Sequence, residues 1–80
     1  MENIQLKEST IKSINQISML KDGWYDGNGI KIDNNVINNT ILLHKLFIKN
    51  NINEPVIGPT EQGEIVLQWN KKGIYIEVFN

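Results

Sequence analysis

The chain has no cysteine, which excludes disulfides, thiolate nucleophiles and cysteine-ligated zinc or iron–sulfur centres. Alanine and arginine are also missing, while isoleucine, asparagine and lysine are abundant, a composition typical of an AT-rich genome. No hydrophobic run reaches the length needed to cross a bilayer, and the polar, acidic N-terminus does not resemble a signal peptide. We therefore expect a cytoplasmic protein without a membrane partner.

The sequence also lacks an excess of charge of either sign. Its formal net charge is -1, so it has no general electrostatic attraction to polyanions. Lys71 and Lys72 form a short basic pair without a basic stripe around it, and we expect no nucleic-acid partner. A hydrophobic content of 40% over 80 residues predicts one globular domain, residues 1–80. Near-neutral charge gives weak colloidal repulsion, which leaves a homodimer open.

Residues 23–29 form the most distinctive stretch of the chain. They hold three of the six glycines, one of the two tryptophans and one of the two tyrosines. Large aromatic rings beside glycines indicate a loop that is anchored by the rings and bent where glycine permits unusual backbone angles. We interpret the loop as structural, together with the two tryptophans and the only histidine; these residues are Gly23, Trp24, Asp26, Gly27, Gly29, His44 and Trp69.

Residues 3–20 predict a first helix. Isoleucine and leucine recur there mostly at three-residue intervals, which places them along one broad apolar stripe. Asn3 or Ser9 could cap its N-terminus. We expect the helix to end near Gly23, which suits a left-handed residue after a helix.

Residues 34–50 predict a second helix, with Asp33 as its N-cap and Asn50 and Asn51 at its end. This helix is apolar around much of its circumference, because Leu42 and Leu46 lie opposite its main apolar face. Either it is sandwiched between the first helix and a sheet, which is our first interpretation, or Leu42 and Leu46 belong to a partner interface.

The C-terminal third predicts three strands. Residues 56–57 form a short strand, and two runs with strict apolar alternation follow it. The two-residue spacing around Lys71 and Lys72 predicts a hairpin that pairs Trp69 with Ile74, Leu67 with Ile76, and Ile65 with Val78. One face of the sheet is apolar and needs helices over it. The predicted fold is α+β: two N-terminal helices packed on one face of a three-stranded antiparallel β-meander, in the order ααβββ.

The loop Trp24-Tyr25-Asp26-Gly27-Asn28-Gly29, the prolines at 55 and 59 and the strand Gly-Glu-Ile-Val-Leu-Gln-Trp at 63–69 form a combined pattern. It resembles a family of short, mostly uncharacterised prokaryotic and phage proteins with a Trp-Asp-Gly-x-Gly loop and a Gly-x-Ile-x-Leu-x-Trp strand. The resemblance covers roughly residues 20–79; Tyr25 is inserted in the loop, and Ile30 replaces a small residue. Family members are often found on mobile elements, so the resemblance implies a role in host–phage or toxin–antitoxin conflict.

Candidate chemistry is sparse. Asp22, Asp26, Asn28 and Asp33 are oxygen donors of the kind Ca²⁺ prefers, but their spacing does not match an EF-hand. We expect no metal and no cofactor, and we interpret Asp26 as the cap of a turn.

The only imidazole, His44, lies in the apolar stripe of the second helix, and we interpret it as a packed histidine that hydrogen-bonds to Asp26. No hydroxyl lies in a nucleophile motif, and Glu61, Glu64 and Glu77 read as solvated surface. We therefore expect no catalytic residues.

These observations predict a non-enzymatic protein-interaction module. With the resemblance, they suggest an inhibitor of a host protein encoded by a phage or mobile element, for example an anti-defence or anti-CRISPR factor. An antitoxin or immunity protein is one alternative. A small-molecule or metal-binding module that uses the loop from Trp24 to Gly29 is another. We expect the protein partner to contact exposed apolar and aromatic side chains, namely Tyr25, Leu42, Leu46, Val66, Tyr75 and Phe79.

Overall fold

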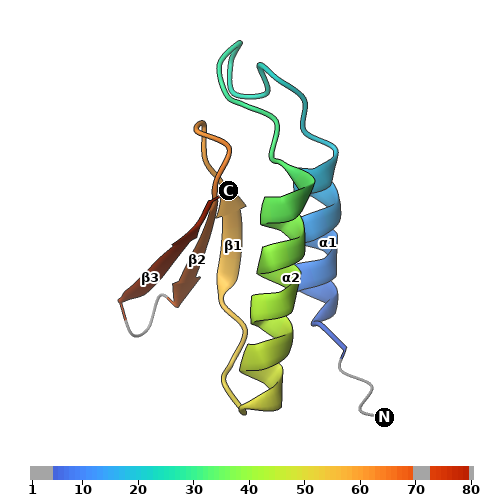
Figure 1. Ribbon diagram of the computed structural model, residues 1–80, viewed down its shortest axis with the longest axis vertical. Coiled ribbons are helices and arrows are strands. Elements are labelled where there is room, and N and C mark those ends of the chain that lie inside the picture. The colour runs from blue at the N-terminus through green and yellow to red at the C-terminus, as the bar shows by residue number, and fades with distance from the viewer. Residues whose placement is uncertain (1–4, 70–72, 80) are drawn as a thin grey trace.

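The computed structural model describes residues 5–69 and 73–79 (Figure 1). The elements are α1 (Glu8–Ser18), α2 (Asn34–Lys49), β1 (Val56–Pro59), β2 (Ile65–Trp69) and β3 (Ile74–Val78). The three strands form an antiparallel sheet in the order β1-β2-β3. The prediction of an α+β fold with a three-stranded antiparallel sheet is confirmed.

The predicted limits of the first helix are wrong at both described ends. Helix α1 begins at Glu8 and ends at Ser18, so Ser9 lies inside it and is not its cap, while Asn3 lies outside the described residues. The N-cap residue is Lys7, whose amide donates to the Glu54 carboxylate at 2.8 Å. Gly23 has φ +85° but belongs to the following loop. A residue distant in sequence caps this helix, and local capping rules cannot identify it.

Helix α2 begins at Asn34 as the sequence predicts and ends at Lys49, one residue before the predicted end, with Asn50 as its C-cap. The Asp33 carboxylate accepts from the Asn35 amide at 2.8 Å, which confirms the N-cap. After Asn50 the chain turns at Asn51, whose φ is +59°. The Asn51 amide donates to Ile48 and the Ile52 amide donates to Phe47, the hydrogen-bond pair of a Schellman motif.

The predicted hairpin register is confirmed at every pair: Ile65 with Val78, Leu67 with Ile76, and Trp69 with Ile74. Strand β1 is longer than predicted, because it continues through Gly58 to Pro59, which pairs with Ile65. Proline is tolerated there because β1 is an edge strand, where one missing amide donor costs no ladder bond.

The core combines side chains from both helices and the sheet: Ile14, Ile17, Ile32, Val36, Ile37, Ile65, Leu67 and Val78. Helix α1 packs against β1, and α2 packs against β2 and β3. Coverage of the apolar sheet face is incomplete, because Val78 is buried while Ile74, at the other end of β3, is 47% exposed. Figure 1 shows the cause: β2 and β3 diverge from α2 toward the hairpin end of the sheet. The expectation that helices cover the whole apolar face is therefore wrong.

Leu67 tests the energetics of this core. Its side chain is fully buried in the central strand, so Leu67→Ala should lower the free energy of unfolding by about 2–5 kcal/mol in urea titrations. Met19, which is 77% exposed, is the control, and Met19→Ala should change stability by no more than about 0.5 kcal/mol. Equal losses in the two variants would contradict the packing described here.

Candidate functional site

The loop from Trp24 to Gly29 is a miniature hairpin. Tyr25 and Asn28 exchange backbone hydrogen bonds of 2.7 and 2.8 Å. Between them, Asp26 has φ +48° and Gly27 has φ +86°, the signs of φ that a type I′ turn requires. The Asp-Gly dipeptide is the strongest sequence signal for such a turn, and it was the clue by which sequence reasoning could have found the hairpin.

The Trp24 ring closes this hairpin from one side. Its Nε1 donates to the Ile30 carbonyl at 2.9 Å. A Cβ added to Gly29 would lie only 2.9 Å from Trp24 Nε1, so the ring lies directly against the glycine backbone. The Ile30 amide donates to Glu61 in the β1–β2 turn at 2.9 Å, which ties the loop to the sheet. We call this set of contacts the clasp: Trp24 packs on Gly29 and bonds to Ile30, and Ile30 bonds to the β1–β2 turn, so the loop between the helices is attached to the sheet.

The oxygen donors of the loop are engaged or spread apart. Asp22 accepts from the Lys31 amide at 2.8 Å, and Asp33 caps α2. Across residues 5–69 and 73–79, no three His, Asp or Glu side chains come together as a group that could hold a metal ion. These carboxylates stabilise the loop and the helix that follows it.

His44 does not bond to Asp26, and that hypothesis is wrong. Its ring is fully buried, and Nδ1 lies 3.0 Å from Oε1 of Glu54, a residue just before β1. Because a carboxylate can only accept, Nδ1 carries the hydrogen. Nε2 has no hydrogen-bond partner among the described residues, and the ring packs 5.9 Å from that of Phe47.

The Glu54 carboxylate joins three parts of the chain. Oε1 accepts from His44 of α2, and Oε2 accepts from the Lys7 amide at the start of α1. Burial alone would raise the pKa of Glu54, but the hydrogen bonds from His44, Lys7 and Thr10 together lower it below its usual value. Sequence reasoning missed Glu54, because nothing local to it indicates that partners 10 and 47 residues away converge on it.

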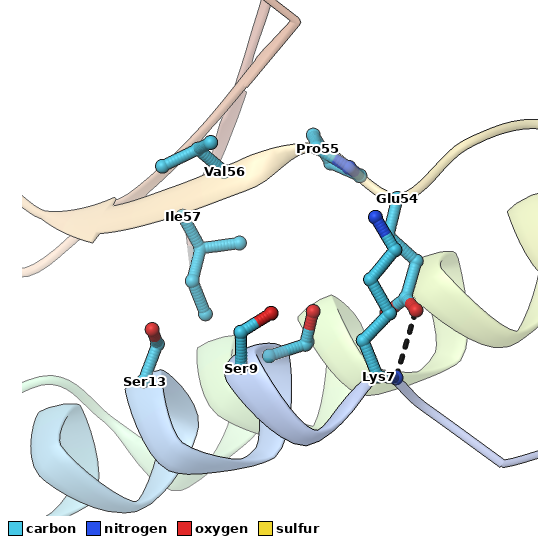
Figure 2. A pocket seen from close by; sticks show the side chains of 8 residues that line it. Lys7, Ser9, Ser13, Glu54, Pro55, Val56 and Ile57 are labelled. Atoms are coloured by element: carbon cyan, nitrogen blue, oxygen red, sulfur yellow. Dashed lines mark hydrogen bonds between the residues drawn. The ribbon is translucent and has the colours of Figure 1, made fainter.

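A small cleft lies beside this carboxylate. It has a volume of about 150 Å³ and lies between α1 and the start of β1. Figure 2 shows the Ser9 and Ser13 hydroxyls along α1 on one side and Val56 and Ile57 on the other, with the Lys7–Glu54 hydrogen bond at one end. The one carboxylate in its lining, Glu54, is already used by the fold.

The six side chains predicted to contact a partner do not form one patch. Tyr25 is 53% exposed on the loop, where its ring packs edge-on against Trp24. Leu42 and Leu46 lie one turn apart on α2 and are 58% and 53% exposed, so they are not sandwiched as the first interpretation had it. The others lie on the sheet face opposite the core-facing positions: Val66, Tyr75 and Phe79.

We call the first of two surfaces the outer face. Its strand residues are Val56, Val66, Gln68, Tyr75 and Glu77, and Glu64 and Phe79 continue the alternation directly before β2 and directly after β3. Three of its apolar side chains are strongly exposed, 64% for Val56, 54% for Tyr75 and 65% for Phe79, whereas Val66, which the sequence predicted to be exposed, is only partly exposed in the central strand. Sequence reasoning missed Val56, although its pairing with Gln68 places it in the same alternation. The charged side chains in this set are both acidic.

Two carboxylates come close together on the outer face. Tyr75 donates its hydroxyl hydrogen to Glu77 at 2.7 Å, and this bond raises the pKa of Tyr75. Partial desolvation, and then the proximity of Glu77, raise the pKa of Glu64. The outer face thus combines apolar side chains with concentrated negative charge.

We call the second surface the hairpin groove. It is an apolar hollow of about 280 Å³ between the end of α2 and the hairpin, lined by Phe47, Ile52, Trp69, Ile74 and Ile76. The Phe47 and Trp69 rings pack edge-to-face at 5.1 Å, and the indole donates to the Asn53 carbonyl at 2.6 Å. The groove is open because the sheet diverges from α2 at this end.

Comparisons with protein-family models, with curated proteins and with solved structures gave no match. The resemblance to short phage and prokaryotic proteins therefore stays a prediction. Among the helices of the described chain, none is both long and apolar enough to span a membrane.

Gly29 and Gly27 test the clasp. Both have positive φ, so alanine at either position should cost about 1–2 kcal/mol of stability. Gly29→Ala should cost at least about 1 kcal/mol more, because its Cβ would displace the Trp24 ring, whereas a Cβ at Gly27 meets nothing within 4 Å. Urea titrations measure the difference, and equal losses would contradict a clasp closed by Trp24.

Glu54→Gln tests the buried carboxylate. The carboxylate has two acceptor oxygens, whereas the amide has one, and the amide NH₂ is a donor that would face another donor. The free energy of unfolding of the variant should therefore be about 1.5–3 kcal/mol lower than that of wild type near pH 7. Since folding lowers the pKa of Glu54, this stabilisation is present above pH 4.5 and is lost as the pH falls below that value. The gap in melting temperature between wild type and variant should therefore narrow in acid.

The matched control for this prediction is Glu61→Gln, which changes an exposed carboxylate on the β1–β2 turn. It should leave the melting temperature nearly unchanged from pH 7 to acid. If the difference in melting temperature between wild type and Glu54→Gln stays constant or widens in acid, the charge of Glu54 does not stabilise the fold.

Proposed function

We propose that this protein is a non-enzymatic protein-interaction module that binds its partner through the outer face. The observation that carries the proposal is the exposure of Val56 and Tyr75 on the sheet face that also carries Val66 and Glu77, with Phe79 exposed directly after β3. A solvated face of an antiparallel sheet normally carries polar side chains. Apolar and aromatic side chains with a polar rim are typical of a protein-binding surface.

The proposal takes both helices to pack on one face of the meander, which leaves the other face for a partner. In support, α1 packs against β1 and α2 against β2 and β3, and core residues from both helices meet Ile65, Leu67 and Val78. Figure 1 shows the two helices on the same side of the strands.

A non-enzymatic role is supported by the engagement of the polar groups that could act in catalysis. His44 is fully buried and bonded to Glu54, and Asp22 and Asp33 hold backbone amides. The protein is therefore proposed to act by occupying a surface of its partner, which an 80-residue domain can do without building a deep cleft.

The chemistry of the outer face defines the partner. Glu64 and Glu77 lie among Val66, Tyr75 and Phe79, so a complementary surface is apolar and bordered by lysine or arginine. With the resemblance to proteins of mobile elements, the specific proposal is an inhibitor of a host defence protein, acting in the cytoplasm, that covers a basic functional surface of its target.

An affinity capture tests this proposal. Tagged protein is used to capture partners from lysate of a low-GC bacterium that carries defence systems, and retained proteins are quantified by mass spectrometry. A stoichiometric partner should bind wild type and be reduced about tenfold or more by Val56→Glu and by Phe79→Glu, because each adds like charge and removes apolar contact. Binding of the purified partner should also weaken as salt is raised.

The matched control is Met19→Glu, which makes the same type of change at a 77% exposed apolar residue just after α1. This variant should retain the partner at the wild-type level. A partner lost equally from all three variants, or kept by all of them, would argue against the outer face. Capture of nothing by folded wild type would argue against the interaction function in that host.

A further inference from the structure

The outer edge of β3 is open for strand pairing. In the described sheet β3 has a neighbour on one side only. Natural proteins protect such edges with proline, lysine or bulges. The opposite edge strand, β1, contains Gly58 and Pro59 and is packed against α1. Strand β3 contains no proline, and Glu77 is its one charged residue.

We propose that β3 pairs antiparallel with β3 of a second copy of this chain, and that the two α2 helices pack together above the joined sheet. The result is a two-fold symmetric dimer with a continuous six-stranded sheet. Its interface is the β3 edge, the hairpin groove and the exposed leucines of α2. It does not depend on the proposed function, because the outer face points away from the helices and only Tyr75 and Glu77 of that face border the joined edge.

Charge and shape select one register for this pairing. Registers that keep the helices of both copies on the same side are centred on Tyr75, Ile76 or Glu77, because side chains alternate along a strand. A centre at Glu77 would place two glutamates directly opposite each other, which is destabilising. A centre at Tyr75 would pair Ile74 with Ile76 and leave Val78 beyond the strand of the second copy.

The register centred on Ile76 pairs the whole strand with itself. Ile74 then lies opposite Val78, and Ile76 lies opposite Ile76, so the apolar row continues across the interface. Tyr75 lies opposite Glu77 twice, and its hydroxyl already bonds to a Glu77 carboxylate at 2.7 Å within one chain. The same donor and acceptor can therefore bond across the two copies, and the edge is self-complementary in charge as well as in shape.

The position of α2 fits this arrangement. Within the sheet, the backbone of α2 lies closest to β2 and β3, whereas α1 lies closest to β1. Strands lie about 4.8 Å apart, so two helices centred over β2–β3 and its symmetry copy would stand about 10 Å apart. Packed helices have interaxial distances of about 8–10 Å. The joined sheet therefore places the two α2 helices at contact distance.

The dimer accounts for apolar surface that a monomer leaves in water. Leu46 lies about one turn after Leu43 and directly precedes Phe47, which lines the hairpin groove. Packing of the second α2 covers Leu46, which is 53% exposed, and it borders Leu42; the joined sheet and helices cover Ile74, which is 47% exposed. The groove becomes part of an interior shared by the two copies.

Sedimentation equilibrium of the full chain over a concentration series tests the proposal. Wild type should reach twice its chain mass of 9.2 kDa. Leu46→Glu should raise the dimer dissociation constant by about tenfold or more, because it places two carboxylates near the symmetry axis. Met19→Glu and Val56→Glu, which lie outside the interface, should dimerise like wild type. A monomeric wild type, or a Leu46→Glu variant that dimerises as tightly as Met19→Glu, overturns the proposal.

Cysteine crosslinking tests the register, since the chain has no native cysteine. Directly opposed residues in neighbouring strands have Cβ atoms about 5 Å apart, so Ile76→Cys should form a covalent dimer with a short thiol crosslinker. Val56→Cys is the control, because its two copies would lie five strands, about 24 Å, apart. Equal crosslinking of both variants, or of neither, overturns this register. Circular dichroism confirms that each variant is folded.

Discussion

The buried carboxylate of Glu54 is the interaction on which the arrangement of the layers depends. It accepts from the Lys7 amide at the start of α1 and from His44 in the middle of α2, and it lies immediately before β1. Its side chain is only 3% exposed, so removing either donor would leave a buried charge incompletely bonded. Hydrophobic contacts between the helices and the sheet have little directionality. The hydrogen bonds of this carboxylate, in contrast, form only when the Lys7 amide and the His44 ring lie at defined distances and angles from it. It therefore specifies where α1 begins and how it lies relative to α2.

The size of the chain limits how much of the sheet can be covered. Two helices of 11 and 16 residues pack against three strands, and coverage is complete near Val78 but not near Ile74. A small domain buries a smaller fraction of its surface than a large one, so some apolar side chains stay at the surface. Here they collect on two separate surfaces, the outer face and the hairpin groove. We propose the first for a basic, apolar partner and the second for a second copy of the chain, and the two proposals use separate surfaces.

Sequence reasoning succeeded where the determining interaction is local. The two-residue period of β2 and β3 predicted every pair of the hairpin, and the Asp33 cap and the Asn51 turn delimit α2 as expected. It failed where the determining contact is distant: α1 is capped through Glu54, and the partner of His44 is Glu54 instead of Asp26. For the candidate site, the exposed residues Tyr25, Leu42, Leu46, Tyr75 and Phe79 were identified correctly as exposed. Their separation into different surfaces could not be read from spacing, because it depends on the angle between α2 and the sheet.

The sequence by itself determined the strand register, the second helix and the α+β class, because alternation, capping and turn chemistry act over a few residues. Only the tertiary structure decided where the uncovered surface lies. The divergence of β2 and β3 from α2 leaves Ile74 exposed, although its place in the alternation of β3 predicts a core-facing side chain. Burial is a property of the packed layers and not of a residue type, so an apolar side chain becomes core or binding surface according to whether another element reaches it.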